Sequence, residues 1–182
     1  MILPRATALL VLVVMTWPAT TVQGAGEESE LLERAGSAAV GEAAPWLSGW
    51  TLDGAVWNTR MALERPEVSR LALVFWASWC VPCRTGIARL RDAQDTLDDD
   101  GVSVILVNVG EREAQVRGFF DDDPPPWPVL LDPHGRTCET WIERGSGDCT
   151  LPLTAIVVPD GTVVSLIGAE GADYVDRVAG AK

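Results

Sequence analysis

Two cysteines separated by two residues, Cys80 and Cys83, stand near the middle of this chain in the segment FWASWCVPCR. This spacing lets the two sulfur atoms close a small ring, so the pair can cycle between dithiol and disulfide without a large backbone movement. The apolar run from Leu71 to Trp76 predicts a buried strand, and apolar residues recur with helical spacing from Val81 to Leu97. Any fold of this chain must therefore place the pair at a strand-to-helix junction.

This junction predicts different roles for the two cysteines. Free amides and the positive end of the helix dipole stabilise a thiolate, so we expect Cys80 to be the exposed, attacking nucleophile. Cys83, one turn into the helix, should be more buried and should resolve the mixed disulfide. Pro82 suits the first turn, because the amide hydrogen that proline lacks has no partner there in any case.

Two other uses of a CxxC pair fit this chain less well. A zinc site needs a second close pair, whereas Cys138 and Cys149 are separated by ten residues. A purely structural disulfide across so short a loop restricts the unfolded chain little. We therefore expect redox use of Cys80 and Cys83, with no metal and no other cofactor.

The first 24 residues have the pattern of a cleaved export signal. Met1 to Arg5 carries one basic side chain, Ala6 to Met15 is almost wholly apolar, and Val22 to Gly24 offers small residues where a signal peptidase cleaves. The apolar stretch is shorter than the roughly 20 residues that span a bilayer as a helix. We predict a signal peptide at 1–24 and a periplasmic or otherwise extracytoplasmic location, with an uncleaved membrane anchor as the alternative.

The length and the charge of the chain limit the number of domains and the classes of partner. Removing 24 of the 182 residues leaves 158, for which we predict a flexible lead-in at 25–40 and a single domain at 41–182. The formal charge of −12 repels phosphate backbones, so we expect no nucleic-acid partner, and we expect a monomer. The acid clusters Asp98 to Asp100 and Asp121 to Asp123 lack the spaced ligands of an EF-hand loop and are interpreted as solvated turns.

Strand and helix patterns alternate along the chain. An N-terminal hairpin is predicted from Trp46 to Leu52 with Ala55 to Trp57, and a closing hairpin from Thr154 to Val158 with Thr162 to Ile167. Between the hairpins, besides the strand before Cys80, two more strands are predicted: Val102 to Val109 and Val129 to Leu131. Further helices are predicted within Thr59 to Ser69 and over Glu111 to Phe120, Arg136 to Glu143 and Ala172 to Ala179. This order indicates an α/β sandwich with a central mixed sheet and flanking helices.

The succession of WASWCVPC, VILVNV, LLDPHG and LPLTAIVVPDG resembles the thioredoxin superfamily, and within it the exported TlpA/ResA-like thiol-disulfide oxidoreductases. The resemblance covers about Gly41 to Lys182 and implies a thioredoxin-like sandwich. It also implies that Pro152 follows a cis bond, and that Leu151 and Pro152 pair with an extended substrate chain beside Cys80. An ordinary proline at a strand edge is the alternative for Pro152.

Other residues next to the cysteines are expected to contact the substrate as well: Trp79, Val81 and Pro82.

Two departures from the family pattern concern acids near Cys83. Relatives often place Glu three residues after the second cysteine and Pro two residues further on, where this chain has Gly86 and Ala88, and thioredoxins carry a buried Asp where this chain has Val74. A buried thiol without a nearby base resists ionisation. The sequence therefore predicts slow resolution by Cys83 at neutral pH, and a faster step in a Gly86→Glu variant.

The second cysteine pair, Cys138 and Cys149, is an addition to the minimal pattern. We expect a structural disulfide that ties down the segment leading into Pro152, because exported thiols usually pair. A second redox station that exchanges with Cys80 is the alternative. His134, the only histidine, lies in a turn-forming segment and is interpreted as a solvated residue.

The resemblance implies an exported protein disulfide oxidoreductase. We expect a reductase that passes electrons from a membrane thiol-disulfide donor to disulfide-containing exported proteins, with cytochrome c maturation as one family role. The alternatives are a binding module whose CxxC stays oxidised, and a disulfide-forming oxidant. A peroxidase fits less well, because peroxide-reducing relatives place Thr before a single attacking cysteine, where this chain has Trp79 and a CxxC.

Overall fold

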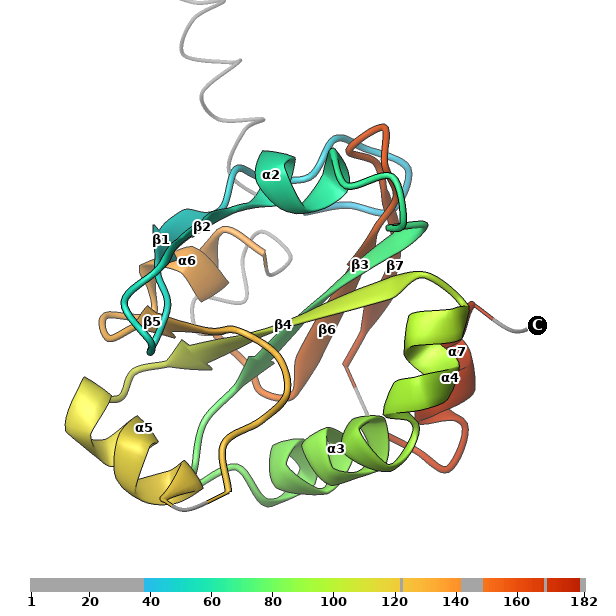
Figure 1. Ribbon diagram of the computed structural model, residues 1–182. Helices are drawn as coiled ribbons and strands as arrows, with labels where there is room; N and C mark the ends of the chain where they lie inside the picture. Colours follow the sequence, from blue (N-terminus) through green and yellow to red (C-terminus); the bar gives the residue numbers. More distant parts are fainter. Residues whose placement is uncertain (1–37, 122, 142–148, 169, 181–182) are drawn as a thin grey trace, which may run out of the picture. The chain divides into compact units, whose positions relative to one another are not determined.

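The computed structural model describes residues 38–121, 123–141, 149–168 and 170–180; the predicted signal peptide and most of the predicted lead-in lie outside these ranges. Five strands form a central sheet in the order β5-β4-β3-β6-β7 (Figure 1). The middle strand, β3, is parallel to β4 and antiparallel to β6, so the sheet is mixed, as predicted. The strand bounds are β3 Arg70–Trp76, β4 Val102–Val109, β5 Val129–Asp132, β6 Leu153–Val157 and β7 Val163–Ile167.

Both faces of this sheet are covered by helices or loops. Because side chains alternate along a strand, β3 sends Ala72, Val74 and Trp76 to one face and Leu71, Leu73 and Phe75 to the other, and all six are fully buried. The first face packs against α3 (Val81–Asp92), α4 (Gln94–Asp99), α5 (Glu113–Phe120) and α7 (Tyr174–Ala179). The second packs against α2 (Thr59–Leu63) and α6 (Arg136–Glu139). The result is the predicted α/β sandwich.

A short strand pair precedes the main sheet. β1 (Ser48–Trp50) and β2 (Val56–Asn58) are antiparallel and form the predicted N-terminal hairpin. The helix α2 starts directly after β2, because the Asn58 side chain caps it by accepting a hydrogen bond from the Met61 amide at 2.9 Å. A single bridge between Thr51 and Leu130 links the hairpin to β5.

Several predicted helices differ from the observed ones at their ends. The helix expected from Val81 to Leu97 is divided into α3 and α4, because Ala93 leaves helical geometry at φ −100° and ψ 10°. The helix expected from Glu111 starts only at Glu113, and Glu111 is buried beside β4 instead. α6 ends at Glu139, four residues earlier than predicted. Apolar periodicity locates a helix better than it locates the ends, where capping and tertiary contacts decide.

The acidic segments interpreted as solvated turns lie at the surface where they are described. Asp98, Asp99 and Asp100 are all exposed at the end of α4. Asp123 pairs with Arg91 of α3.

Within the described ranges, no helix has the length and apolar content to span a membrane.

Candidate active site

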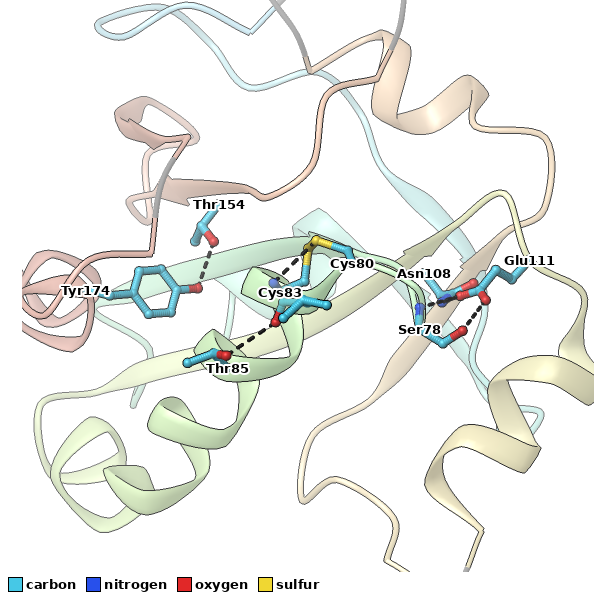
Figure 2. Close-up of a disulfide and its surroundings, with 9 residues drawn as sticks. Ser78, Cys80, Cys83, Thr85, Asn108, Glu111, Thr154 and Tyr174 are labelled. Carbon is cyan, nitrogen blue, oxygen red and sulfur yellow. Dashed lines mark hydrogen bonds between the residues drawn. A yellow bond between two sulfur atoms is a disulfide. The ribbon is translucent and has the colours of Figure 1, made fainter.

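The disulfide between Cys80 and Cys83 lies at the N-terminus of α3, a few residues after the end of β3 (Figure 2). The two Cα atoms are 5.3 Å apart. Cys80 is the N-cap residue of α3, and its Sγ accepts a hydrogen bond from the Cys83 amide at 3.3 Å. Pro82 occupies the first turn. Once the disulfide is reduced, this amide and the helix dipole both favour a thiolate at Cys80.

Burial distinguishes the two cysteines less than the sequence predicts. Cys80 is 4% exposed and Cys83 is fully buried, so the expected exposure of Cys80 is slight in this oxidised state. The neighbours of Cys80 carry the exposed surface instead, since Trp79 is 68% exposed and Val81 is 60% exposed. Trp79 and Val81 therefore form an exposed apolar surface beside Cys80.

The segment around Pro152 reaches the same end of the sheet. A cis peptide bond joins Leu151 to Pro152, as predicted. The next residue, Leu153, pairs with Phe75 near the end of β3, and Cys80 follows that strand. Leu151 also packs against the core cluster that contains Cys80. The predicted substrate contacts thus come from two segments at the same end of the sheet, and their binding of substrate stays a prediction.

Glu111 anchors the loop that leads into Cys80, and the sequence analysis missed it. Its carboxylate accepts hydrogen bonds from the Ser78 amide at 2.7 Å, from the Ser78 hydroxyl and from Asn108 Nδ2 at 2.8 Å (Figure 2). Burial alone would favour the neutral acid, but these hydrogen bonds outweigh it and hold the pKa of Glu111 below its ordinary value. Asn108, a polar residue inside the apolar run VSVILVNV, is the sequence signal that a buried partner was needed.

A second acid that the sequence analysis missed lies against α3. The Glu170 carboxylate occupies the space beside Gly86, and a Cβ added at Gly86 would overlap both carboxylate oxygens. Both oxygens are buried, and among the described groups no donor meets them in full hydrogen-bond geometry, although the Gly86 amide lies nearby. Burial raises the pKa of Glu170 to about 7, although the nearby Gly86 amide and the Arg89 charge oppose this rise.

This placement corrects the expectation that Gly86 leaves the buried cysteine without a nearby acid. An acid does lie at this turn of α3, but it comes from the segment between β7 and α7. The expectation for Gly86→Glu changes with it, because any side chain at Gly86 must displace Glu170. No local pattern around Glu170 signals this contact, since the two residues are 84 positions apart in the sequence.

Hydroxyl groups, rather than an acid, lie beside Val74. Val74 pairs with Thr154 of β6, and the Thr154 hydroxyl is 2.8 Å from the Tyr174 hydroxyl. Figure 2 shows this pair on one side of the disulfide and the Ser78–Glu111 contact on the other. Burial raises the pKa of Tyr174 well above its ordinary value, so its phenol stays protonated.

The second cysteine pair is also joined by a disulfide, with Cα atoms 5.6 Å apart. Cys138 is fully buried in α6, and both cysteines pack on the face of the sheet that carries Leu71, Leu73 and Phe75. Cys80 and Cys83 belong to the opposite face. The sheet therefore separates the two disulfides, which favours the structural role over exchange with Cys80.

His134 is exposed in its turn between β5 and α6.

We expect the double variant Cys138→Ser/Cys149→Ser to be less stable but active. Its lost cross-link closes a loop of about ten residues, which corresponds to roughly 2–3 kcal/mol of unfolding free energy. Denaturant unfolding of the oxidised proteins measures the loss, and a disulfide-reduction assay measures the activity. Lost activity with unchanged stability would instead assign the pair a redox role.

Comparisons with known proteins identify the family of this chain. Residues 40–166 match the AhpC/TSA family. The thiol-disulfide oxidoreductase ResA of Oceanobacillus iheyensis is 27% identical over 78% of this chain and 70% of its own length. The thiol:disulfide interchange protein DsbE homolog of Paracoccus denitrificans is 32% identical over 70% of this chain and 65% of its own length.

The fold is shared with solved structures as well. A thiol:disulfide interchange protein of the thioredoxin family from Chlorobium tepidum superimposes with a TM-score of 0.62 at 23% identity, over 78% of this chain and 96% of that chain. With the CxxC disulfide at the head of α3, these similarities show that the chain belongs to the AhpC/TSA family and is a thioredoxin-fold, ResA/DsbE-type thiol-disulfide oxidoreductase.

Proposed function

We propose that this oxidoreductase is exported and that it reduces disulfide bonds in other extracytoplasmic proteins. The observation that carries the proposal is the position of the Cys80–Cys83 disulfide, at an end of the sheet that also presents Trp79, Val81 and the Leu151–Pro152 segment. An exposed apolar surface beside a redox pair suits a polypeptide substrate better than a small polar thiol.

The reaction conserves atoms and electrons in two steps. The Cys80 thiolate attacks one sulfur of the substrate disulfide, forms a mixed disulfide and releases the other substrate sulfur as a thiolate. Cys83 then loses its proton and attacks Cys80 Sγ, which restores the Cys80–Cys83 disulfide and releases the second substrate thiolate. The substrate gains two electrons and the protein loses two.

Export sets a further requirement. Residues 1–24, outside the described ranges, have the pattern of a signal peptide. Thiols in an oxidising compartment become disulfides, so a reductase there needs a donor that returns two electrons to Cys80 and Cys83. We propose a membrane thiol-disulfide protein as the donor, and the oxidised cysteine pairs of cytochrome c precursors as one class of substrate.

The reduction potential of Cys80 and Cys83, equilibrated with glutathione or a stronger dithiol buffer, tests the direction of exchange. We expect a value near that of thioredoxin, about −270 mV, rather than that of a strong oxidant, about −120 mV. A value close to the oxidant would reverse the proposed direction. A pair that no dithiol reduces would instead support the binding module.

Export is tested separately, in the source cell. The mature protein should be recovered from the extracytoplasmic fraction, and N-terminal sequencing should begin at Ala25. Recovery of the uncleaved chain in the membrane fraction would support the anchor instead.

A further inference from the structure

We propose that Glu170 accepts the proton of Cys83 when Cys83 resolves the mixed disulfide on Cys80. The segment between β7 and α7 would thus supply the acid that α3 itself lacks. This inference rests on thiol-disulfide exchange through Cys80 and Cys83, and it requires neither export nor the reducing direction of the proposed function.

Helix geometry places the carboxylate near the buried thiol. Gly86 follows Cys83 by three residues in α3, and both belong to its buried face. Side chains three residues apart in a helix emerge on the same face, with Cβ atoms about 5–6 Å apart. The Glu170 carboxylate fills the position that a Gly86 side chain would occupy. This spacing would let the carboxylate reach Cys83 Sγ, either directly or through one bridging water.

The state of this carboxylate suits proton transfer. Its two oxygens are buried, and neither meets a described donor in full hydrogen-bond geometry, although the Gly86 amide lies close enough to favour the ionised form. Its pKa, raised by burial to about 7, leaves a substantial ionised fraction at neutral pH. A base whose pKa lies near the working pH combines availability with the ability to take a proton.

The other groups that face Glu170 do not compete for this role. The Arg89 guanidinium of α3 is a permanent cation, and it donates to the backbone carbonyls of Glu170 at 2.9 Å and of Gly171. The Tyr174 phenol of α7 is already paired with Thr154, and its own pKa is raised, in part by Glu170. Arg89 thus binds the backbone of Glu170 and Gly171, and of these described groups Glu170 is the one that can take up a proton.

The proposed step is balanced. The Cys83 S–H bond breaks, its proton goes to a Glu170 oxygen, and the resulting thiolate forms the S–S bond with Cys80. The bond between Cys80 and the leaving thiolate breaks at the same time. In the opposite direction, protonated Glu170 returns the proton to Cys83 as the Cys80–Cys83 bond opens.

A single-turnover reaction with the chromogenic disulfide dithiobis(nitrobenzoate) separates the two steps. The full mature protein is reduced selectively at Cys80 and Cys83, as checked by thiol titration. The first coloured thiolate released reports attack by Cys80, and the second reports resolution by Cys83. The first phase is thus an internal control for folding and for access to Cys80.

We expect Glu170→Gln to leave the first phase unchanged and to slow the second roughly 100-fold at pH 7, the lower end of what a positioned base contributes. The wild-type second phase should rise through pH 7 and then level off, following the ionisation of Glu170. In Glu170→Gln that rise should be absent near pH 7 and should appear only at more alkaline pH, where Cys83 ionises unaided. A purely structural role would not produce this change of pH profile.

Two further variants keep the test decisive if Glu170→Gln folds poorly. Gly86→Ala leaves the acid in the chain but displaces it, so the second phase should slow again. The exchange variant Glu170→Ala/Gly86→Glu removes the overlap and returns a carboxylate to the same place from α3, so most of the wild-type rate should return.

The inference is wrong if the second phase and its pH profile are the same in wild type, Glu170→Gln and Gly86→Ala. It is also wrong if both phases slow equally. Failure of the proposed function gives a different result: the protein would not reduce protein disulfides in its own compartment, while both phases and their dependence on Glu170 persist.

Discussion

Replacing Cys80 with Ser should reduce the rate of disulfide reduction to that of the uncatalysed exchange, whereas replacing Cys83 with Ser should trap the substrate as a mixed disulfide. Cys80 borders the exposed surface and caps α3, where its thiolate is stabilised, while Cys83 is fully buried. Loss of the nucleophile prevents the first bond from forming, and loss of the resolving thiol prevents it from breaking. Mass spectrometry of each variant after incubation with a disulfide peptide distinguishes the two outcomes.

The controls for this prediction use the same chain. The Cys138→Ser/Cys149→Ser variant loses two cysteines on the other face of the sheet and should still turn over. Alkylation of the reduced wild type near neutral pH should label Cys80 before Cys83. Faster labelling of Cys83, or mixed disulfides that accumulate on Cys83 in a Cys80→Ser variant, would reverse the assignment of the two roles.

Replacing Glu111 with Ala should destabilise the protein by about 2–4 kcal/mol. The substitution removes a buried acceptor and leaves the Ser78 amide, the Ser78 hydroxyl and the Asn108 amide without their partner. We expect exchange activity to fall with stability, because Ser78 lies two residues before Cys80 and Glu111 holds it in place. Denaturant unfolding measures the first effect, and the rate of Cys80 attack in single turnover measures the second.

Ser78→Ala is the matched control, since it removes one hydroxyl and keeps the hydrogen bond of the backbone amide. It should lower the free energy of unfolding by about 1 kcal/mol.

The contribution of Glu111 to stability also depends on pH in a defined direction. Because its pKa is lowered in the folded state, its contribution is present above the ordinary carboxyl range and is lost as the pH falls through the folded value. Equal stability of wild type and Glu111→Ala at neutral pH would show that the contact is not a significant anchor.

Much of this protein follows from local patterns in its sequence. The buried run Leu71 to Trp76, the CxxC after it and the alternation of strands and helices predicted the mixed sheet and the position of the redox pair. The cis bond before Pro152 and both disulfides are present as expected. The sheet and the CxxC pair depend on residue spacing within one or two elements, which hydrophobic periodicity and cysteine spacing carry directly, whereas the cis bond was implied by the resemblance to the thioredoxin superfamily.

The acids around the site depend instead on contacts between distant segments. From the local sequence, Gly86 predicts that no acid lies near Cys83. In the structure, the glycine leaves the space that the Glu170 carboxylate fills from a segment 84 residues later in the chain. Glu111 was predicted to be the first residue of a helix, but in the structure it is buried and accepts hydrogen bonds from Ser78 and Asn108. The sequence by itself predicted the α/β sandwich with its mixed sheet and the position of the CxxC pair at a strand-to-helix junction, since these follow from local periodicity and cysteine spacing. Only the tertiary structure decided which carboxylates lie beside them, because burial and pKa depend on what packs against a side chain rather than on its neighbours in the sequence.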